Sequence, residues 1–105
     1  MQMYDLFLGR SIPARGDVTD SEWRSFLDDT VSANLPNGYT VQDAYGAWLN
    51  PATQHTAREA TIVIRVALPD TSDSLAAVNR IRTAYQERFH QQLVGMSATP
   101  VCGWF

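Results

Sequence analysis

The chain has 105 residues, of which 45% are hydrophobic and 18% are charged, and its net charge is -3. This length fits one domain spanning residues 1–105, and this composition supports a buried core and excludes a disordered chain. The negative charge argues against nucleic acid as a partner, because nucleic-acid-binding surfaces are strongly basic. All eight basic residues are arginine, which excludes Schiff-base chemistry on a lysine and a lysine-based phosphate loop.

Segments that would direct the chain to a membrane are missing from the sequence. The start, Met1 to Asp5, lacks a basic region followed by an apolar run, and no apolar stretch approaches the ~20 residues of a membrane span. The single cysteine, Cys102, cannot form an internal disulfide. We therefore expect a soluble cytoplasmic protein without a membrane partner, or an exported one if a leader has been removed.

The first half of the chain predicts a strand, a helix and a second strand. Met3 to Ile12 is rich in leucine and aromatic residues and ends at a proline, which is typical of a strand entering a loop. Thr19 and Glu22 have the spacing of a capping box, and an apolar stripe follows at helical spacing until Gly38. The stripe consists of Trp23, Phe26, Leu27, Val31 and Leu35.

The second strand is expected over Tyr39 to Leu49, where Gly46 indicates a bulge or the close approach of another backbone. A polar connection, Asn50 to Ala57, separates it from the strongest strand signal of the chain, Glu59 to Leu68. This third strand is expected to be central.

A second helix and a last strand complete the chain. Ser72 or Asp73 is expected to cap the helix after Pro69. Its apolar stripe consists of Leu75, Val78, Ile81, Tyr85 and Phe89. The last strand is expected over Val94 to Phe105, and the proline at position 100 favours an edge position for it.

The order βαββαβ with right-handed crossovers predicts an α+β fold: a ferredoxin-like sandwich with a four-stranded antiparallel sheet and both helices on one face. Side chains alternate along a strand, so one face of the third strand carries an isoleucine-rich core set. The opposite, open face then carries Val63 and Arg65 beside Asp5 and Phe7 of the first strand. These residues are either ordinary exposed side chains with one salt bridge, or an interface with a second copy of the chain that includes Phe7, Val63 and Arg65.

Three charged residues near strand ends are candidates for chemistry. Arg10 could hold a carboxylate or phosphate, with Arg58 nearby, and Glu59 could act as an acid or base. The simpler explanation for these residues is a surface salt bridge, or for Glu59 the capping of a loop.

Aromatic residues beside Gly46 form a further candidate. Tyr45 and Trp48, with Asp43 just before them, could form a stacking wall for a ring-shaped ligand, although Trp48 could also be an ordinary core residue. The two histidines lie far apart in the sequence without a carboxylate partner, so neither a metal site nor a cofactor is expected.

The sequence resembles a family of small bacterial proteins of unknown function, many of which are exported lipoproteins. The residues that carry the resemblance are Phe7-x-Gly9-Arg10, Trp23-x-x-Phe26-Leu27, Pro36 to Trp48, Arg58-Glu59, Tyr85 to Val94, and Val101-Cys102 with Phe105. The resemblance covers nearly the whole chain and implies a shared fold, but no activity. It draws attention to matching polar positions, namely Arg10, Asp43, Trp48, Glu59 and Gln91.

Two functions follow as hypotheses. In the first, the chain is a non-catalytic binding or interaction module that forms a homodimer through the open sheet face. In the second, it is a small enzyme or a small-molecule binder, with an anionic ligand held by Arg10 near Asp43, Trp48, Arg58 and Gln91, and with Glu59 as the acid or base. The second hypothesis predicts that these residues converge in one pocket at a sheet edge.

Overall fold

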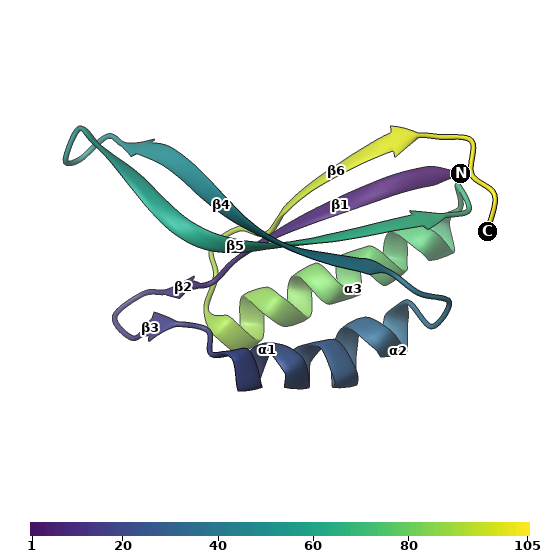
Figure 1. The fold of residues 1–105 in the computed structure, drawn as a ribbon, viewed down its shortest axis with the longest axis horizontal. Helices are drawn as coiled ribbons and strands as arrows, with labels where there is room; N and C mark the ends of the chain where they lie inside the picture. Colours follow the sequence, from purple (N-terminus) through teal and green to yellow (C-terminus); the bar gives the residue numbers. More distant parts are fainter.

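The computed structural model describes all 105 residues and shows a sheet covered by helices on one face (Figure 1). The sheet contains β1 (Gln2–Gly9), β4 (Thr40–Asn50), β5 (His55–Leu68) and β6 (Gly95–Pro100). These strands lie in the order β4-β5-β1-β6 and all neighbours are antiparallel. The predicted α+β fold is therefore confirmed, with the first and third predicted strands at the centre and the proline-containing last strand at an edge.

The helices form the second layer, below the sheet in Figure 1. One is continuous from α1 (Asp20–Phe26) through a π-helical segment, η1 (Leu27–Val31), to α2 (Ser32–Asn34), and the other is α3 (Ser72–Phe89). A small hairpin of β2 (Ser11–Ile12) and β3 (Gly16–Asp17) joins the end of β1 to α1. No helix combines the length and the apolar character that crossing a membrane requires.

The core lies between the two layers. The face of the sheet that packs against the helices is the face that the sequence predicts. The buried side chains of the sheet are Tyr4, Leu6 and Leu8 from β1 and Ile62, Ile64 and Val66 from β5. The helices bury the predicted stripes against them, except that Leu27 is only partly buried and Leu75 is exposed. The predicted register is thus confirmed, because a shift by one residue would have turned these side chains to the other face.

The first helix begins as the sequence predicts. The Thr19 side chain accepts a hydrogen bond from the Glu22 backbone N–H at 3.1 Å, and the Glu22 carboxylate accepts one from the Thr19 N–H at 3.0 Å. Its middle differs from a regular α-helix. Phe26 and Val31 are five residues apart and both are fully buried. The wider π-helical turn explains this, because its i→i+5 bonding brings residues five apart toward the same face.

Several predicted boundaries are wrong. Half of the segment expected as a polar connection lies in the strands of a hairpin, since β4 ends at Asn50, β5 begins at His55 and only residues 51–54 form the turn. The first strand ends at Gly9, and the last strand stops at Pro100 instead of Phe105. The cap of α3 is Thr71, whose hydroxyl accepts from the Ser74 N–H. Gly46 pairs regularly with Glu59 and forms no bulge.

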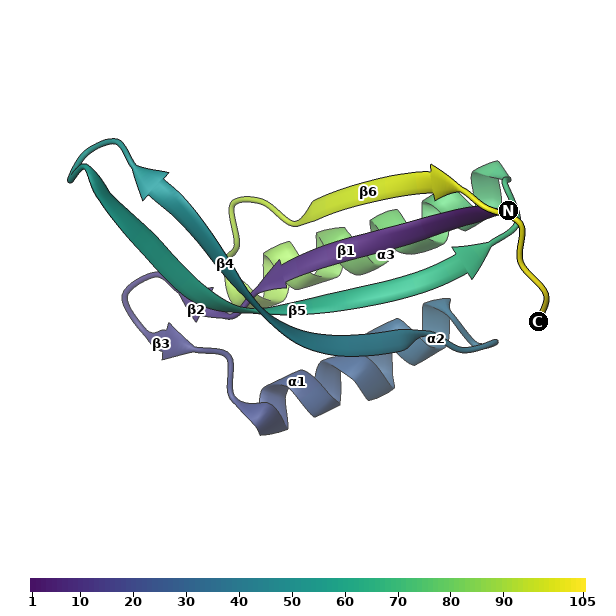
Figure 2. The same cartoon turned by 45° about the horizontal axis from the view of Figure 1, so that its top comes forward.

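The β4–β5 hairpin is longer than the rest of the sheet. Its distal part extends past the helices as an arm (Figure 2), so this part of both strands has no helix against it. The molecule is correspondingly elongated, with extents of 45 × 27 × 21 Å. Exposed large side chains on the arm are Tyr45, Trp48 and Leu49.

Candidate functional site

The carboxylate of Glu59 lies against the end of β1, at a place that only a glycine leaves open. A Cβ on Gly9 would lie 2.7 Å from Glu59 Oε1 and 2.8 Å from its Oε2. The Ser11 backbone N–H donates to Oε2 at 3.2 Å, while Oε1 accepts no hydrogen bond from the protein. The carboxylate is thus held on one side and has a free acceptor on the other.

The backbone beside Glu59 is fixed from the core. The buried Tyr85 hydroxyl on α3 donates to the Gly9 carbonyl at 2.8 Å, and the Arg10 N–H donates to the Ala60 carbonyl at 2.9 Å. Burial raises the pKa of Tyr85, with the charge of Glu59 acting in the same direction. The Tyr85 hydroxyl therefore keeps its proton and remains a donor to the strand end.

Gln91 reaches the same strand end from the other side. His90 ends α3 in the left-handed conformation, with φ of 54°, and this reverses the chain direction after the helix. Gln91 Nε2 then donates to the Ser11 carbonyl at 2.7 Å and to the Phe89 carbonyl at 3.3 Å. Both amide protons are used, so the side-chain oxygen of Gln91 remains free to accept.

Two hollows meet at these side chains. We name them after one aromatic residue in each. The Trp48 hollow, of about 580 Å³, is lined by Ser11, Pro13, Trp48, Ala57, Arg58, Glu59, His90, Gln91, Gln92 and Leu93. The Phe7 hollow, of about 430 Å³, is lined by Phe7, Gly9, Ala44, Tyr45, Gly46, Glu59, Thr61, Val63, Gln91, Leu93 and Gly95. Glu59, Gln91 and Leu93 line both, and each volume lies within the range of ~300–1,000 Å³ that is usual for small-molecule sites.

Four of the predicted site residues therefore lie together: Trp48, Arg58, Glu59 and Gln91 line the Trp48 hollow. Trp48 is 52% exposed, so the alternative that it is an ordinary core residue is wrong. Arg58 is exposed and takes part in none of the four ion pairs of the structure.

Arg10 and Asp43 lie apart from this group. The Arg10 guanidinium donates twice to the Val18 carbonyl and once to Asp20, at distances of 2.6 to 3.1 Å, and its side chain is only 17% exposed. Hydrogen bonding from Arg10 lowers the pKa of Asp20. Arg10 thus closes the small β2–β3 hairpin onto the start of α1. Asp43 is exposed on β4 opposite Ile62 and lines neither hollow.

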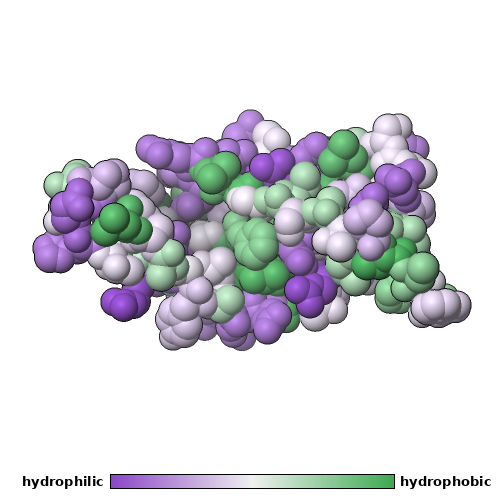
Figure 3. Space-filling model, turned by 90° about the horizontal axis from the view of Figure 1, so that it is seen from above, coloured by the Kyte–Doolittle hydropathy of each residue, from purple (hydrophilic) through white to green (hydrophobic).

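The predicted interface residues lie on the open face of the sheet. Phe7 pairs with Val63, and Asp5 pairs with Arg65, whose Nε donates to the Asp5 carboxylate at 2.7 Å. The expected salt bridge is therefore present. Figure 3 views this face and shows apolar surface at its centre between hydrophilic side chains. The Phe7 hollow opens within this region, so one face carries both a candidate interface and part of a candidate site.

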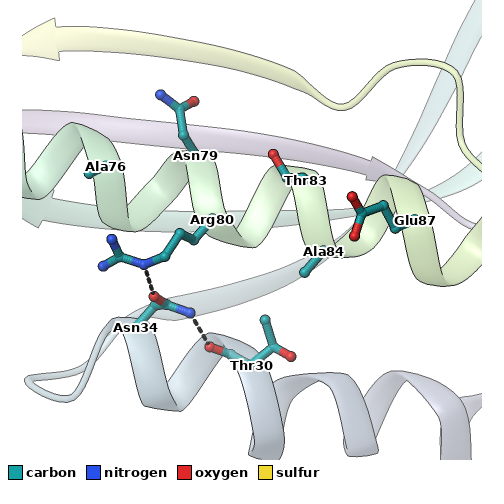
Figure 4. A pocket seen from close by; sticks show the side chains of 8 residues that line it. All are labelled: Thr30, Asn34, Ala76, Asn79, Arg80, Thr83, Ala84 and Glu87. Atoms are coloured by element: carbon teal, nitrogen blue, oxygen red, sulfur yellow. Dashed lines mark hydrogen bonds between the residues drawn. The ribbon is translucent and has the colours of Figure 1, made fainter.

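A third hollow, of about 600 Å³, lies between the helices (Figure 4). Some of its polar groups bind one another: Arg80 Nε donates to Asn34 Oδ1 at 2.7 Å, and Asn34 Nδ2 donates to the Thr30 carbonyl at 2.9 Å. Only two of its eight lining residues are hydrophobic. This groove offers a ligand less apolar surface than the hollows at Glu59.

Metal ligands do not gather in the structure, since no three side chains of histidine, cysteine, aspartate or glutamate are placed to hold an ion. His55 lies at the start of β5 on the arm, whereas His90 lines the Trp48 hollow. Cys102 is free and exposed.

Sequence reasoning missed three contributors to this site. Ser11 acts through its backbone, and Tyr85 was assigned to the core without its hydrogen bond to Gly9. Leu93 lines both hollows although it is 72% exposed. The resemblance did include Gly9 and Tyr85, and that was the available signal; Leu93 gave none, because a leucine in a loop carries no pattern.

Comparison with known proteins identifies the family. The model described as "Protein of unknown function (DUF3574)" matches residues 3–105. The chain belongs to this family. The family assignment therefore agrees with the resemblance to a family of unknown function, and it covers all the residues of the Glu59 site. A comparison with curated proteins finds no match.

Two solved structures share the fold of this family member. A phage SAM lyase in complex with S-methyl-5′-thioadenosine has a TM-score of 0.69 and 15% sequence identity, covering 93% of this chain and 79% of that chain. A phage SAM lyase in the apo state has a TM-score of 0.67 and 15% identity, covering 93% and 78%. At this identity the likeness establishes a common fold.

Proposed function

We propose that this protein binds a small nucleoside of the type of S-methyl-5′-thioadenosine at Glu59. The observation that carries the proposal is the Glu59 carboxylate, which is seated over Gly9 with one oxygen free between two hollows. A ribose presents two adjacent hydroxyl donors, and a carboxylate oxygen with a neighbouring amide oxygen is a matching pair of acceptors. The ligand of the phage SAM lyase that shares the fold supplies the candidate.

This proposal replaces the anionic ligand expected from Arg10. The Arg10 guanidinium already binds Val18 and Asp20, and the free groups at the centre of the site are the acceptor oxygens of Glu59 and Gln91. Acceptors repel an anion and favour a ligand with hydroxyl or amino donors, or with a positive charge. Arg58, which forms no ion pair, lines only the Trp48 hollow, so the groups shared by both hollows favour a neutral or cationic nucleoside.

The test is a calorimetric titration of the protein with S-methyl-5′-thioadenosine. Glu59→Gln should weaken binding about tenfold to hundredfold, because a hydrogen bond to a charged group contributes ~1.5–3 kcal/mol. Glu87→Gln, which removes the same charge on the exposed side of α3, should leave binding unchanged. Absence of binding to the unaltered protein, or equal binding by the Glu59 variant, would contradict the proposal.

Self-association through the open face is a second candidate, supported by a different observation. Phe7 is 42% exposed at the centre of that face, beside Val63 and the Asp5–Arg65 pair. Exposed apolar surface rimmed by polar side chains is typical of interaction sites. A homodimer would cover this surface, and light scattering over a wide concentration range is the direct measurement.

A further inference from the structure

We infer that the ligand lies across Glu59, with its planar base in the Trp48 hollow and its 5′ substituent in the Phe7 hollow, and that the Phe7 hollow excludes a 5′-phosphate. This inference rests on the proposed nucleoside function and adds an orientation and a specificity to it. The observation is that Glu59 and Gln91 line both hollows, so donors of the ligand that bind them must sit between its two ends.

The Trp48 hollow has the groups that bind a planar ring. Trp48 is half exposed, and Arg58 and His90 line the same hollow. Indole, guanidinium and imidazole groups all stack against aromatic bases. The Phe7 hollow has two aromatic rings in its lining, Phe7 and Tyr45, but no tryptophan, arginine or histidine, so it offers fewer stacking groups and no guanidinium. The base therefore belongs in the Trp48 hollow.

The Phe7 hollow is apolar at its floor and is kept open by small residues. Phe7 and Val63 lie side by side on β1 and β5, and Ala44, Gly46 and Gly95 surround them. A Cβ on Gly95 would lie 3.5 Å from the Phe7 ring, directly in this space. A small apolar group such as a methylthio group fits these surroundings.

The charge of the Phe7 hollow determines what it rejects. Glu59 is the only charged residue in its lining. Arg65, the nearest cation on the same face of β5, is paired with Asp5 at 2.7 Å, and Arg58 lines the Trp48 hollow but not this one. A phosphate in this hollow would lose hydration and face a carboxylate without any cation to bind it. The site should therefore accept neutral or cationic 5′ groups and reject nucleotides.

The experiment compares three ligands by calorimetry: S-methyl-5′-thioadenosine, adenosine and adenosine 5′-monophosphate. The unaltered protein should bind the thioether about tenfold more tightly than adenosine, because the methylthio group adds apolar surface to the buried part. The monophosphate should bind at least tenfold more weakly than adenosine. Equal or tighter binding of the monophosphate would overturn the specificity.

Variants test the orientation. Val63→Ser should lower the affinity for the thioether toward that of adenosine and leave adenosine within about twofold. Gly95→Ala, which narrows the same hollow, should act in the same direction. Trp48→Ala should weaken both ligands by about tenfold or more. Circular dichroism checks that each variant is folded.

The possible outcomes separate the two proposals. If the thioether does not bind the unaltered protein, the proposed function fails and the orientation fails with it. If the thioether binds and depends on Glu59, but Val63→Ser weakens both ligands equally or Trp48→Ala weakens neither, the function stands and the orientation alone is overturned.

Discussion

At the scale of single residues, the site depends on the hydrogen atom that Gly9 has in place of a side chain. Gly9→Ala would put a Cβ within 2.9 Å of three atoms of the Glu59 carboxyl group. The carboxylate ends a flexible side chain and can move away, so we expect the melting temperature to fall by only a few degrees. Binding of S-methyl-5′-thioadenosine should fall at least tenfold, because the acceptor has moved.

Gly103→Ala is the matched control for this change. Gly103 lines neither hollow, and its added Cβ would lie 2.7 Å from the ring of Phe105, an exposed side chain that can move away. The added crowding is therefore similar, but the Glu59 carboxylate stays in place. If both variants lose the same affinity by calorimetry, the contact between the Glu59 carboxylate and Gly9 has no specific role in binding.

The capping box gives a prediction for acid. The hydrogen bond from Arg15, together with the Thr19 backbone N–H, lowers the pKa of Glu22 from 4.5 to about 2. A carboxyl group whose pKa is lowered by folding stabilises the fold above its unfolded pKa, and this stabilisation disappears as the pH falls through the folded pKa. Glu22→Gln should therefore lower the melting temperature at pH 7, and the difference from the unaltered protein should shrink between pH 4.5 and pH 2.

Thermal melts of both proteins at several pH values measure this difference. Other carboxylates with lowered pKa values, such as Asp20 and Asp29, titrate in both proteins and cancel in the comparison. A difference that stays constant down to pH 2 would mean that the Glu22 charge does not stabilise the helix start.

The candidate site could be predicted from the sequence only in part, and the residues show why. Glu59 and Arg58 were predicted from their charges at the start of a strand and Trp48 from the aromatic residues beside Gly46, and the resemblance added Gln91. Arg10 was predicted as a ligand clamp, but its guanidinium binds a carbonyl eight residues away. That bond depends on how a tight hairpin folds back, which residue types alone do not determine.

At the scale of elements, η1 allows an unusual test. A π-helical turn contains one residue more than an α-helical turn, so removing one residue from it should leave an α-helix with both halves still facing the core. Deleting the exposed Asp28 should therefore lower the melting temperature by no more than about 6 °C, which corresponds to about 1 kcal/mol in a domain of this size. Circular dichroism with heating measures both helix content and melting.

Deleting the exposed Ala76 from the regular helix α3 is the control. That deletion rotates the following part of the helix by about 100° and turns Val78 and Ile81 away from the core. We expect this variant to be largely unfolded. If the two deletions lower the melting temperature equally, η1 does not result from one inserted residue in an otherwise regular helix.

The elements themselves were largely predictable, with two exceptions. The capping box and apolar stripes identified both helices, because these signals depend on local spacing. The π-helical turn was missed, because an apolar stripe with a partly buried Leu27 satisfies a 3.6-residue period almost as well. The arm was missed because its strands bury no face against a helix, so residues 50–57 have the polarity of a loop.

At the scale of the whole molecule, the strand order followed from topology rules, since two right-handed crossovers leave few arrangements for four strands. What covers the open face could not be predicted in this way. Side chains on that face are the same whether they meet water, a ligand or another protein, and exposed apolar residues are common on monomers. Only a measurement on the protein in solution distinguishes these cases.

Self-association makes a prediction that separates the two faces of the sheet. Val63 and Val41 lie on neighbouring strands, Val63 on the open face and Val41 on the helix face of the edge strand β4. If two copies pair through the open face, Val63→Asp should raise the dimer dissociation constant at least tenfold, because each copy would bury a charge in the interface. Val41→Asp should leave the constant unchanged, since it adds the same charge outside the interface.

Light scattering coupled to size-exclusion chromatography measures the constant over a range of concentrations. A monomer at every concentration would remove the interface and leave the open face to the ligand. A dimer that both variants weaken equally would move the interface to the edge strand or the arm, where Tyr45 and Leu49 are exposed. A dimer sensitive only to Val63→Asp would place the Phe7 hollow beneath a second copy, and ligand binding and self-association would then be thermodynamically linked.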